Sequence, residues 1–219
     1  MKKEWIGYIG IGILACAALL CGILYTRAAR LQHDISEKVL RFHVLANSDN
    51  EADQNLKLAV RDAVGSYMQK KLAGVEDLEE CEQIVNGNLD QIREVAAETI
   101  AQNGYDYDVT AELEYTSFPV KSYGSYTFPA GEYEALRVVI GEGKGHNWWC
   151  VMYPNMCFSG SMYEVVDEKA GKKLREVLTT EEYEKVLAEG DYQVRMKYFS
   201  WLNPYLEKLA ENERIVKEP

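Results

Sequence analysis

The sequence predicts an α+β protein: a mostly antiparallel sheet with two amphipathic helices packed on one face, preceded by an N-terminal transmembrane or signal-anchor helix. Three observations lead to this fold class. An apolar run without any charge, Ile6 to Tyr25, lies near the N-terminus. Apolar residues then recur at helical spacing between residues 56 and 100. From Asp108 onward, polar and apolar residues alternate as they do in a strand.

The first expected element is the apolar segment Ile6 to Tyr25. Its 20 residues, at about 1.5 Å rise each, span roughly the 30 Å hydrocarbon layer of a bilayer. A short basic N-terminus before a long acidic domain favours the N-terminus inside and the domain outside. The tripeptide Ala15-Cys16-Ala17 has the small residues of a signal-peptide cleavage site, but the apolar run continues past it. An uncleaved anchor is favoured, and a cleaved signal stays open.

The next expected elements are a strand and a helix. Val39 to Ala46 alternates in apolar content and is rich in β-formers, which predicts the strand. Ser48 stands three residues before Glu51, the spacing of a capping box at a helix start. The apolar residues that follow predict an amphipathic helix ending near Gly74: Leu56, Val60, Val64, Tyr67, Met68 and Leu72.

A second amphipathic helix is expected from Leu78 to Ile100, with a kink at Asn86-Gly87-Asn88 and a left-handed exit at Asn103-Gly104. The period then changes to 2. A strand with one solvent-exposed face is predicted. Tyr126 to Phe128 then leads into a turn and a second strand, so that this segment is expected to form a hairpin, and a third short strand follows. These segments are Asp108 to Phe118, Pro129 to Glu132, Tyr133 to Ile140 and Trp148 to Met152.

The last third of the chain predicts two more helices. Thr179 or Thr180 can cap one that runs through Leu187, and a final helix is expected from Tyr192 to Leu209. The expected organisation is a membrane anchor or signal segment at 1–30, an extracytoplasmic α+β domain at 31–158 and a helical C-terminal extension at 159–219.

Charge restricts the class of partner. The formal net charge is -11, and the acidic excess lies beyond the apolar segment. An acidic body is repelled by the phosphates of nucleic acid and by anionic lipid head groups. We therefore expect no nucleic acid, and a protein partner fits better.

The cysteines and histidines predict no metal site and no cofactor. The three histidines and five cysteines form no group at zinc spacing. Cys150 and Cys157 are separated by six residues and can close a short loop if the domain lies outside the cytoplasm, where disulfides persist. Spacing alone does not establish the bond.

The densest group of chemically active side chains lies in the stretch Gly141 to Cys157. Its three alternate glycines, together with Lys144 and His146, suggest an anion cradle, but the spacing is not that of a phosphate-binding loop. A structured hairpin loop is favoured. Trp148 and Trp149 are expected to face opposite sides of a strand, so that the outward one is available to a partner.

An enzyme is the rival class. Cys150 with His146 or His43, or Ser48 with His43 and Asp49, contain the residue types of an extracytoplasmic hydrolase. No nucleophile elbow accompanies them, and the proposed cap would occupy Ser48. No catalytic residue is therefore assigned, and a hydrolase using His43 or His146 is kept as the alternative.

Two blocks resemble the stage II sporulation protein R family. They are RFHVLANSDNEADQNLKLAVRDAV (Arg41 to Val64) and FPAGEYEALRVVIGEGKGHNWWCVMYP (Phe128 to Pro154), with Cys157 after them. The resemblance implies an intercompartmental signalling protein of endospore formation. It would act in the space between forespore and mother cell, where it would activate the membrane-embedded aspartic peptidase that processes pro-sigma-E.

Within the two blocks, surface-capable side chains are the candidates for contact with the peptidase. The first group follows the first strand, and the second group lies in the glycine-rich loop. They are Arg41, His43, Asn47, Asp49, Lys144, His146, Asn147 and Trp148.

Overall fold

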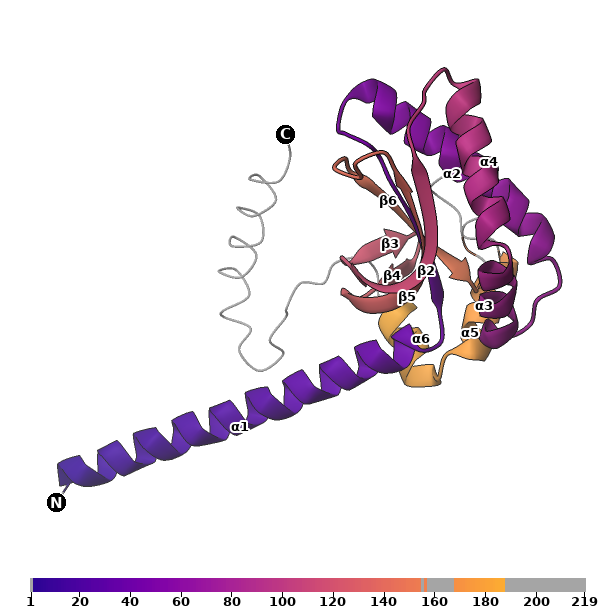
Figure 1. Ribbon diagram of the computed structural model, residues 1–219. Coiled ribbons are helices and arrows are strands. Elements are labelled where there is room, and N and C mark those ends of the chain that lie inside the picture. Colours follow the sequence, from indigo (N-terminus) through magenta and orange to yellow (C-terminus); the bar gives the residue numbers. More distant parts are fainter. Residues whose placement is uncertain (1, 155, 157–167, 188–219) are drawn as a thin grey trace.

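The computed structural model describes residues 2–154, 156 and 168–187, and it has the α+β architecture that the sequence predicts. Figure 1 shows a domain at one end of a long helix. The elements in chain order are α1 (Lys2–Ser36), β1 (Leu40–Leu45), α2 (Glu51–Lys71), α3 (Leu78–Gly87), α4 (Leu89–Gln102), β2 (Val109–Phe118), β3 (Lys121–Tyr123), β4 (Tyr126–Phe128), β5 (Gly131–Ile140), β6 (Asn147–Tyr153), α5 (Glu168–Val177) and α6 (Thr180–Leu187).

The main sheet has the strand order β2-β5-β1-β6. β5 pairs antiparallel with β2 and parallel with β1, and β6 pairs antiparallel with β1. β5 therefore pairs with β2 and not with β4, the strand that leads into the predicted turn. β4 pairs with β3 in a separate two-stranded ladder, which is inserted between β2 and β5. After β1, the helices α2, α3 and α4 carry the chain to β2 at the sheet edge. β5 then lies between β2 and β1.

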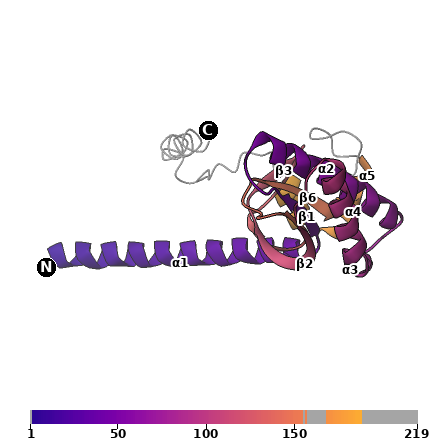
Figure 2. The ribbon, with the colours of Figure 1, turned by 45° about the horizontal axis from the view of Figure 1, so that its top comes forward.

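The sheet is covered on both faces. Leu40, Phe42 and Val44 of β1 point into a core shared with α2, α3 and α4, and these helices lie together over one face of the sheet (Figure 2). Arg41 and His43 alternate with them and point to the opposite face. A second core on that face contains residues from α1, β4, α5 and α6. The sequence predicted helices on one face only.

Two local predictions need refinement. The expected kink divides the second helix into α3 and α4, where Asn88 caps the end of one and precedes the other. The predicted capping box at Ser48 is wrong, because Asn50 is the N-cap of α2 and its Oδ1 accepts the backbone N–H of Asp53 at 2.7 Å. Ser48 lies before the cap and donates to the Asp53 carboxylate instead.

The described part of the C-terminal third packs against the domain. Leu174 and Leu178 of the α5 region and Val186 of α6 are buried in the second core. Glu182 of α6 forms an ion pair with Lys38 at 2.7 Å. The helix predicted from Tyr192 to Leu209 lies outside the described residues.

α1 extends away from the domain, with only its last turns against the sheet (Figure 1). Leu31 and Ile35 reach the second core, while the stretch Gly12–Ser36 is long and apolar enough to cross a membrane and has no buried residue in its apolar window. An apolar helix with no protein packed around it is suited to a bilayer rather than to a protein interior. Anchor and signal segment both remain compatible with this helix.

Candidate functional site

The two family-like blocks meet at one end of the sheet. We call residues 46–50, after β1, and residues 141–146, between β5 and β6, the loop surface. The backbone N–H of Gly145 donates to Ala46 O at 2.9 Å, and that of Lys144 donates to Asn47 O at 3.2 Å. The Asn47 side chain also accepts the N–H of Glu142 at 3.0 Å. Loops that lie about 100 residues apart in the sequence therefore form one hydrogen-bonded unit.

Asp53 holds this unit to α2. Asp53 is only 2 % exposed. Its carboxylate accepts four side-chain hydrogen bonds: from Asn47 at 2.9 Å, Ser48 at 2.6 Å, Asn50 at 3.1 Å and Tyr107 at 3.2 Å. These bonds, that of Ser48 first, hold the pKa of the Asp53 carboxyl below its usual value. A charged acceptor with four donors fixes the shape of the loop that carries Asn47 to Asn50.

Two glycines make the close approach of the loops possible. Gly141 has φ +55, and a Cβ there would overlap the Asn47 amide. A Cβ on Gly145 would overlap the backbone oxygen of Ser48. The alternate glycines thus serve the docking of two loops, and they open no helix that would hold a phosphate. The loop is structured, but the predicted hairpin is wrong, because β1 lies between β5 and β6 in the sheet and these two strands do not pair.

The rim of the loop surface carries exposed charges of both signs. Asp49 accepts the backbone N–H of His146 at 2.6 Å, and the His146 Nδ1 also contacts the same oxygen. Lys144 pairs with Glu142 at 2.8 Å, and each side chain is about 70 % exposed. Four of the eight candidate residues, Asn47, Asp49, Lys144 and His146, are therefore brought together. Exposed polar groups on a fixed backbone suit recognition of another protein.

Arg41 lies in the interior and not on this surface. It is 0 % exposed; its Nε donates to Cys150 O at 2.9 Å and its Nη2 donates to Tyr123 at 3.0 Å. Its guanidinium carbon lies over four aromatic rings, at 4.3 to 5.8 Å from the centroids of Phe118, Tyr123, Phe128 and Tyr133. Burial lowers the pKa of Arg41. Cation–π contacts hold the buried charge, so the described structure gives Arg41 a packing role.

His43 is also buried, at 2 % exposure. Its ring stacks on Trp149 at 5.0 Å and lies 5.2 Å from the ring of Phe118, and within the described residues neither ring nitrogen has a hydrogen-bond partner. Burial, followed by the charges of Arg137 and Arg41, lowers the pKa of His43 to about 3. The neutral imidazole is thus an aromatic packing residue at ordinary pH.

Replacing His43 with phenylalanine is expected to make the protein less sensitive to acid. In the unfolded state His43 binds a proton near pH 6.5, whereas in the folded state it stays neutral down to about pH 3. The free energy of unfolding of the wild type therefore falls by about 2.5 kcal/mol through this group between pH 7 and pH 4.5. Urea unfolding of both proteins at these two pH values measures the difference. An equal loss in both proteins would contradict this account of His43.

The last two partner-binding candidates lie on β6. The Trp148 ring packs against Phe42 at a centroid distance of 5.5 Å and under the Arg61 guanidinium at 5.2 Å. Trp149 lies on the other face against His43, as neighbouring strand residues require. Both tryptophans are half-buried, so neither presents a freely exposed ring. Asn147 is also half-buried, and its Oδ1 has no partner within the described part of the chain.

The residues of the predicted hydrolase are only partly brought together. His146 contacts Asp49, but the Ser48 hydroxyl donates to Asp53 rather than to His146. Cys150 is disulfide-bonded; Cys157 lies outside the described residues, so the pairing of these two cysteines stays a prediction. Among the described side chains, no group of three or more histidine, cysteine or acidic residues is placed to hold a metal ion.

Sequence reasoning missed the residues that organise the loop surface. Asp53 and Tyr107 come from different elements, and Lys57 donates from α2 to His146 O at 3.1 Å. One local signal was available for Asp53, because Asn50 stands three residues before it, which is the spacing of an N-cap and its N3 residue. No local signal pointed to Tyr107.

Comparison with known proteins identifies the family. The family model described as Stage II sporulation protein R matches residues 36–163. A Stage II sporulation protein R of Bacillus subtilis (strain 168) is 34% identical over 196 residues, which cover 87% of each chain. No solved structure matches. The chain therefore belongs to the stage II sporulation protein R family and has a role in sporulation.

Proposed function

We propose that this chain is an extracytoplasmic signalling protein of endospore formation that activates the membrane-embedded aspartic peptidase processing pro-sigma-E. The family resemblance suggests this partner. The apolar helix α1 supports delivery of the domain to, or through, a membrane. The acidic charge of the body supports a protein partner rather than nucleic acid. The domain works in the space between forespore and mother cell, either anchored or released by cleavage.

The observation that carries the proposal is the construction of the loop surface. Its backbone is fixed by hydrogen bonds from two loops, by the buried Asp53 carboxylate and by glycines that leave no space for side chains. Its outward side chains, Asp49, Lys144 and His146, are exposed and charged or polar. A preorganised surface loses little conformational entropy on binding, so it can favour the active arrangement of a receptor by differential affinity.

Reversing the charge of Lys144 tests this surface. Lys144→Glu is expected to reduce sigma-E-dependent reporter expression in sporulating cells at least tenfold, because Glu142 and Asp49 then face a third carboxylate at the contact. Its urea unfolding curve is expected to stay close to that of the wild type, since the side chain is exposed. Lys172→Glu, a charge reversal at another exposed lysine, on α5, is the matched control and is expected to signal normally. Normal signalling by the Lys144 variant would remove this residue from the interface.

The contact between His146 and Asp49 is the one observation that favours the hydrolase. His146→Asn separates the two functions, because the asparagine amide can still donate to Asp49 but cannot serve as a base. We expect His146→Asn to retain most of the sigma-E reporter signal. The hydrolase would be favoured if the His146→Asn variant folds but gives no sigma-E reporter expression while the Lys144→Glu variant gives full expression.

A further inference from the structure

β2 lies at the edge of the main sheet. It is ten residues long, and within the described residues it pairs with β5 along its whole length and with no other strand. An edge strand of this length presents a row of backbone N–H and C=O groups to any extended segment that approaches it. Edge strands of globular domains bind partners by this strand addition.

The free backbone groups of β2 can be assigned from the register. The N–H of Gly141 donates to Asp108 O at 2.8 Å, so Asp108 and every second residue after it direct their backbone groups toward β5. The intervening residues direct theirs outward. They are Val109, Ala111, Leu113, Tyr115 and Ser117. The side chains of Val109, Ala111 and Leu113 pack on the helix-covered face, where β2 lies beside α4.

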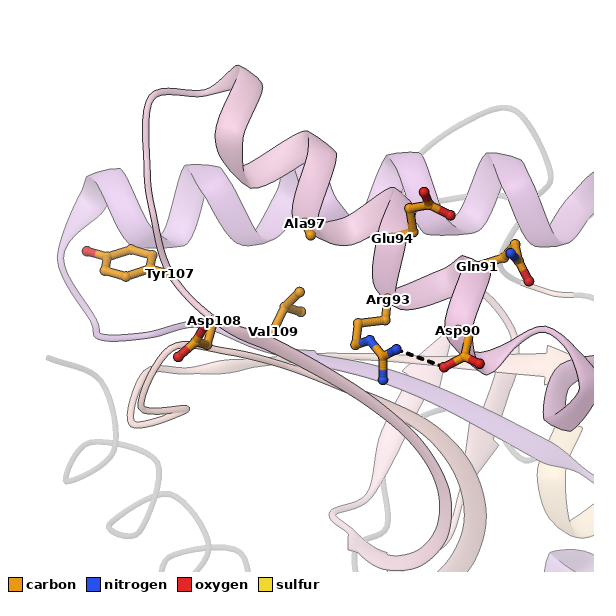
Figure 3. A pocket seen from close by; sticks show the side chains of 8 residues that line it. All are labelled: Asp90, Gln91, Arg93, Glu94, Ala97, Tyr107, Asp108 and Val109. Carbon is orange, nitrogen blue, oxygen red and sulfur yellow. Dashed lines mark hydrogen bonds and ion pairs between the residues drawn. The ribbon is translucent and has the colours of Figure 1, made fainter.

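A groove of about 510 Å³ runs between the start of β2 and α4. Figure 3 shows Val109 pointing from β2 toward α4, with Ala97 on the facing side of the helix. Three acidic residues, Asp90, Glu94 and Asp108, line the groove. The one cation of the lining, Arg93, pairs with Asp90 at 2.8 Å. The groove therefore has an apolar floor and a negative rim.

Acidic groups also gather at the other end of the same edge. Tyr115, 64 % exposed, stands opposite Glu134 of β5. Glu134 lies against Glu82 of α3, and burial together with the hydrogen bond and the charge of Glu134 raises the pKa of Glu82 to about 7. Two crowded carboxyl groups favour the approach of a cation. Acidic sites thus flank both ends of the free edge, roughly 20 Å apart along the strand.

We propose that the free edge of β2 is an interaction surface that takes up an extended segment of a partner protein as an added strand. This segment carries lysine or arginine on the side chains that face α3 and α4. A second copy of this chain fits less well, because two equally acidic edges would face each other. The proposal concerns a surface that adjoins the loop surface at Tyr107 and Asp108, and it does not depend on which protein supplies the segment.

Peptide binding to the full chain in detergent tests the proposal. The probe is a nine-residue peptide of alternating lysine and valine, and an otherwise identical peptide with glutamate for lysine is its control. We expect the glutamate peptide to bind at least tenfold more weakly. In a strand, only every second backbone amide faces the neighbouring strand. N-methylation of that set of amides in the lysine peptide is therefore expected to abolish binding, whereas N-methylation of the other set is expected to leave binding unchanged. Equal binding of all methylated forms would overturn strand addition.

Two protein variants locate the contact. Ala111→Pro removes an outward N–H and leaves the bonds to β5, so at least a tenfold loss of lysine peptide binding is expected with an unchanged thermal unfolding midpoint. Glu94→Gln is expected to weaken binding about threefold, whereas Glu98→Gln, exposed on α4 but outside the groove lining, is expected to leave it unchanged. Normal binding of the lysine peptide by a folded Ala111→Pro variant would overturn the proposal. Dimerisation of the wild type that Ala111→Pro abolishes would also overturn it, because the edge would then bind a second copy of this chain.

Discussion

Replacing Asp53 with alanine is expected to lower the free energy of unfolding by about 3 kcal/mol and to abolish sigma-E reporter activity. The change removes one buried carboxylate and leaves four side-chain donors without their acceptor: those of Asn47, Ser48, Asn50 and Tyr107. The loop that carries Asp49 then loses its fixed shape. Urea unfolding at pH 7 measures the stability, and Asn55→Ala, an exposed change on α2, is expected to change it by less than about 0.5 kcal/mol.

The same variant has an expected pH dependence. The pKa of Asp53 is lower in the folded state than in the unfolded state, so its contribution is present above the unfolded pKa, about 3.9, and is lost as the pH falls through the folded value. The stability difference between wild type and Asp53→Ala is therefore expected to be full at pH 7 and to shrink below about pH 4. A difference that is already small at pH 7 would contradict the central position of Asp53.

Gly145→Ala is the second substitution with a large expected effect. A single Cβ at this position overlaps the Ser48 backbone oxygen and the Ala46 side chain, so the loops must separate and the Gly145 bond to Ala46 O must lengthen or break. We expect a loss of about 2 to 4 kcal/mol in the free energy of unfolding and a loss of signalling.

The matched control is Gly87→Ala at the end of α3, where a Cβ meets no atom within 4 Å. This change is expected to leave stability unchanged or to raise it slightly, because alanine favours the helix more than glycine does. Equal unfolding midpoints for Gly145→Ala and the wild type would show that the two loops do not need this close approach.

Hydrophobic periodicity predicted most of the fold, because the spacing of apolar residues distinguishes a helix from a strand wherever one face of the element is buried. The helical spacing from Leu56 to Leu72 and the alternation from Asp108 to Phe118 both correspond to observed elements, α2 and β2. The break between α3 and α4 follows from Asn88, where the sequence predicted a kink. The β3–β4 ladder was not predicted as a unit, since strands of three residues are too short to show a period.

The candidate site was predicted only in part, because some placements depend on contacts far apart in the sequence. Arg41 and His43 were named as surface-capable candidates, although a half-buried packing role was favoured over catalysis for His43. Both are buried, because β4, α5 and α6 cover the second face of the sheet. Asp49 and His146 were both named from the sequence, and only the structure joins them across 97 positions. Asp53 was missed although Asn50 stands at N-cap spacing before it, whereas its fourth donor, Tyr107, lies beyond α4 and gave no local signal.

The central claim is that α1 delivers an acidic domain to the far side of a membrane, where it acts on another protein. Alkaline phosphatase, which is active only outside the cytoplasm, fused to the C-terminus of the full chain in bacterial cells tests this claim most directly. We expect high phosphatase activity that is lost when residues 1–30 are deleted. A stable full-length fusion without activity, recovered from the cytosol, would contradict the account.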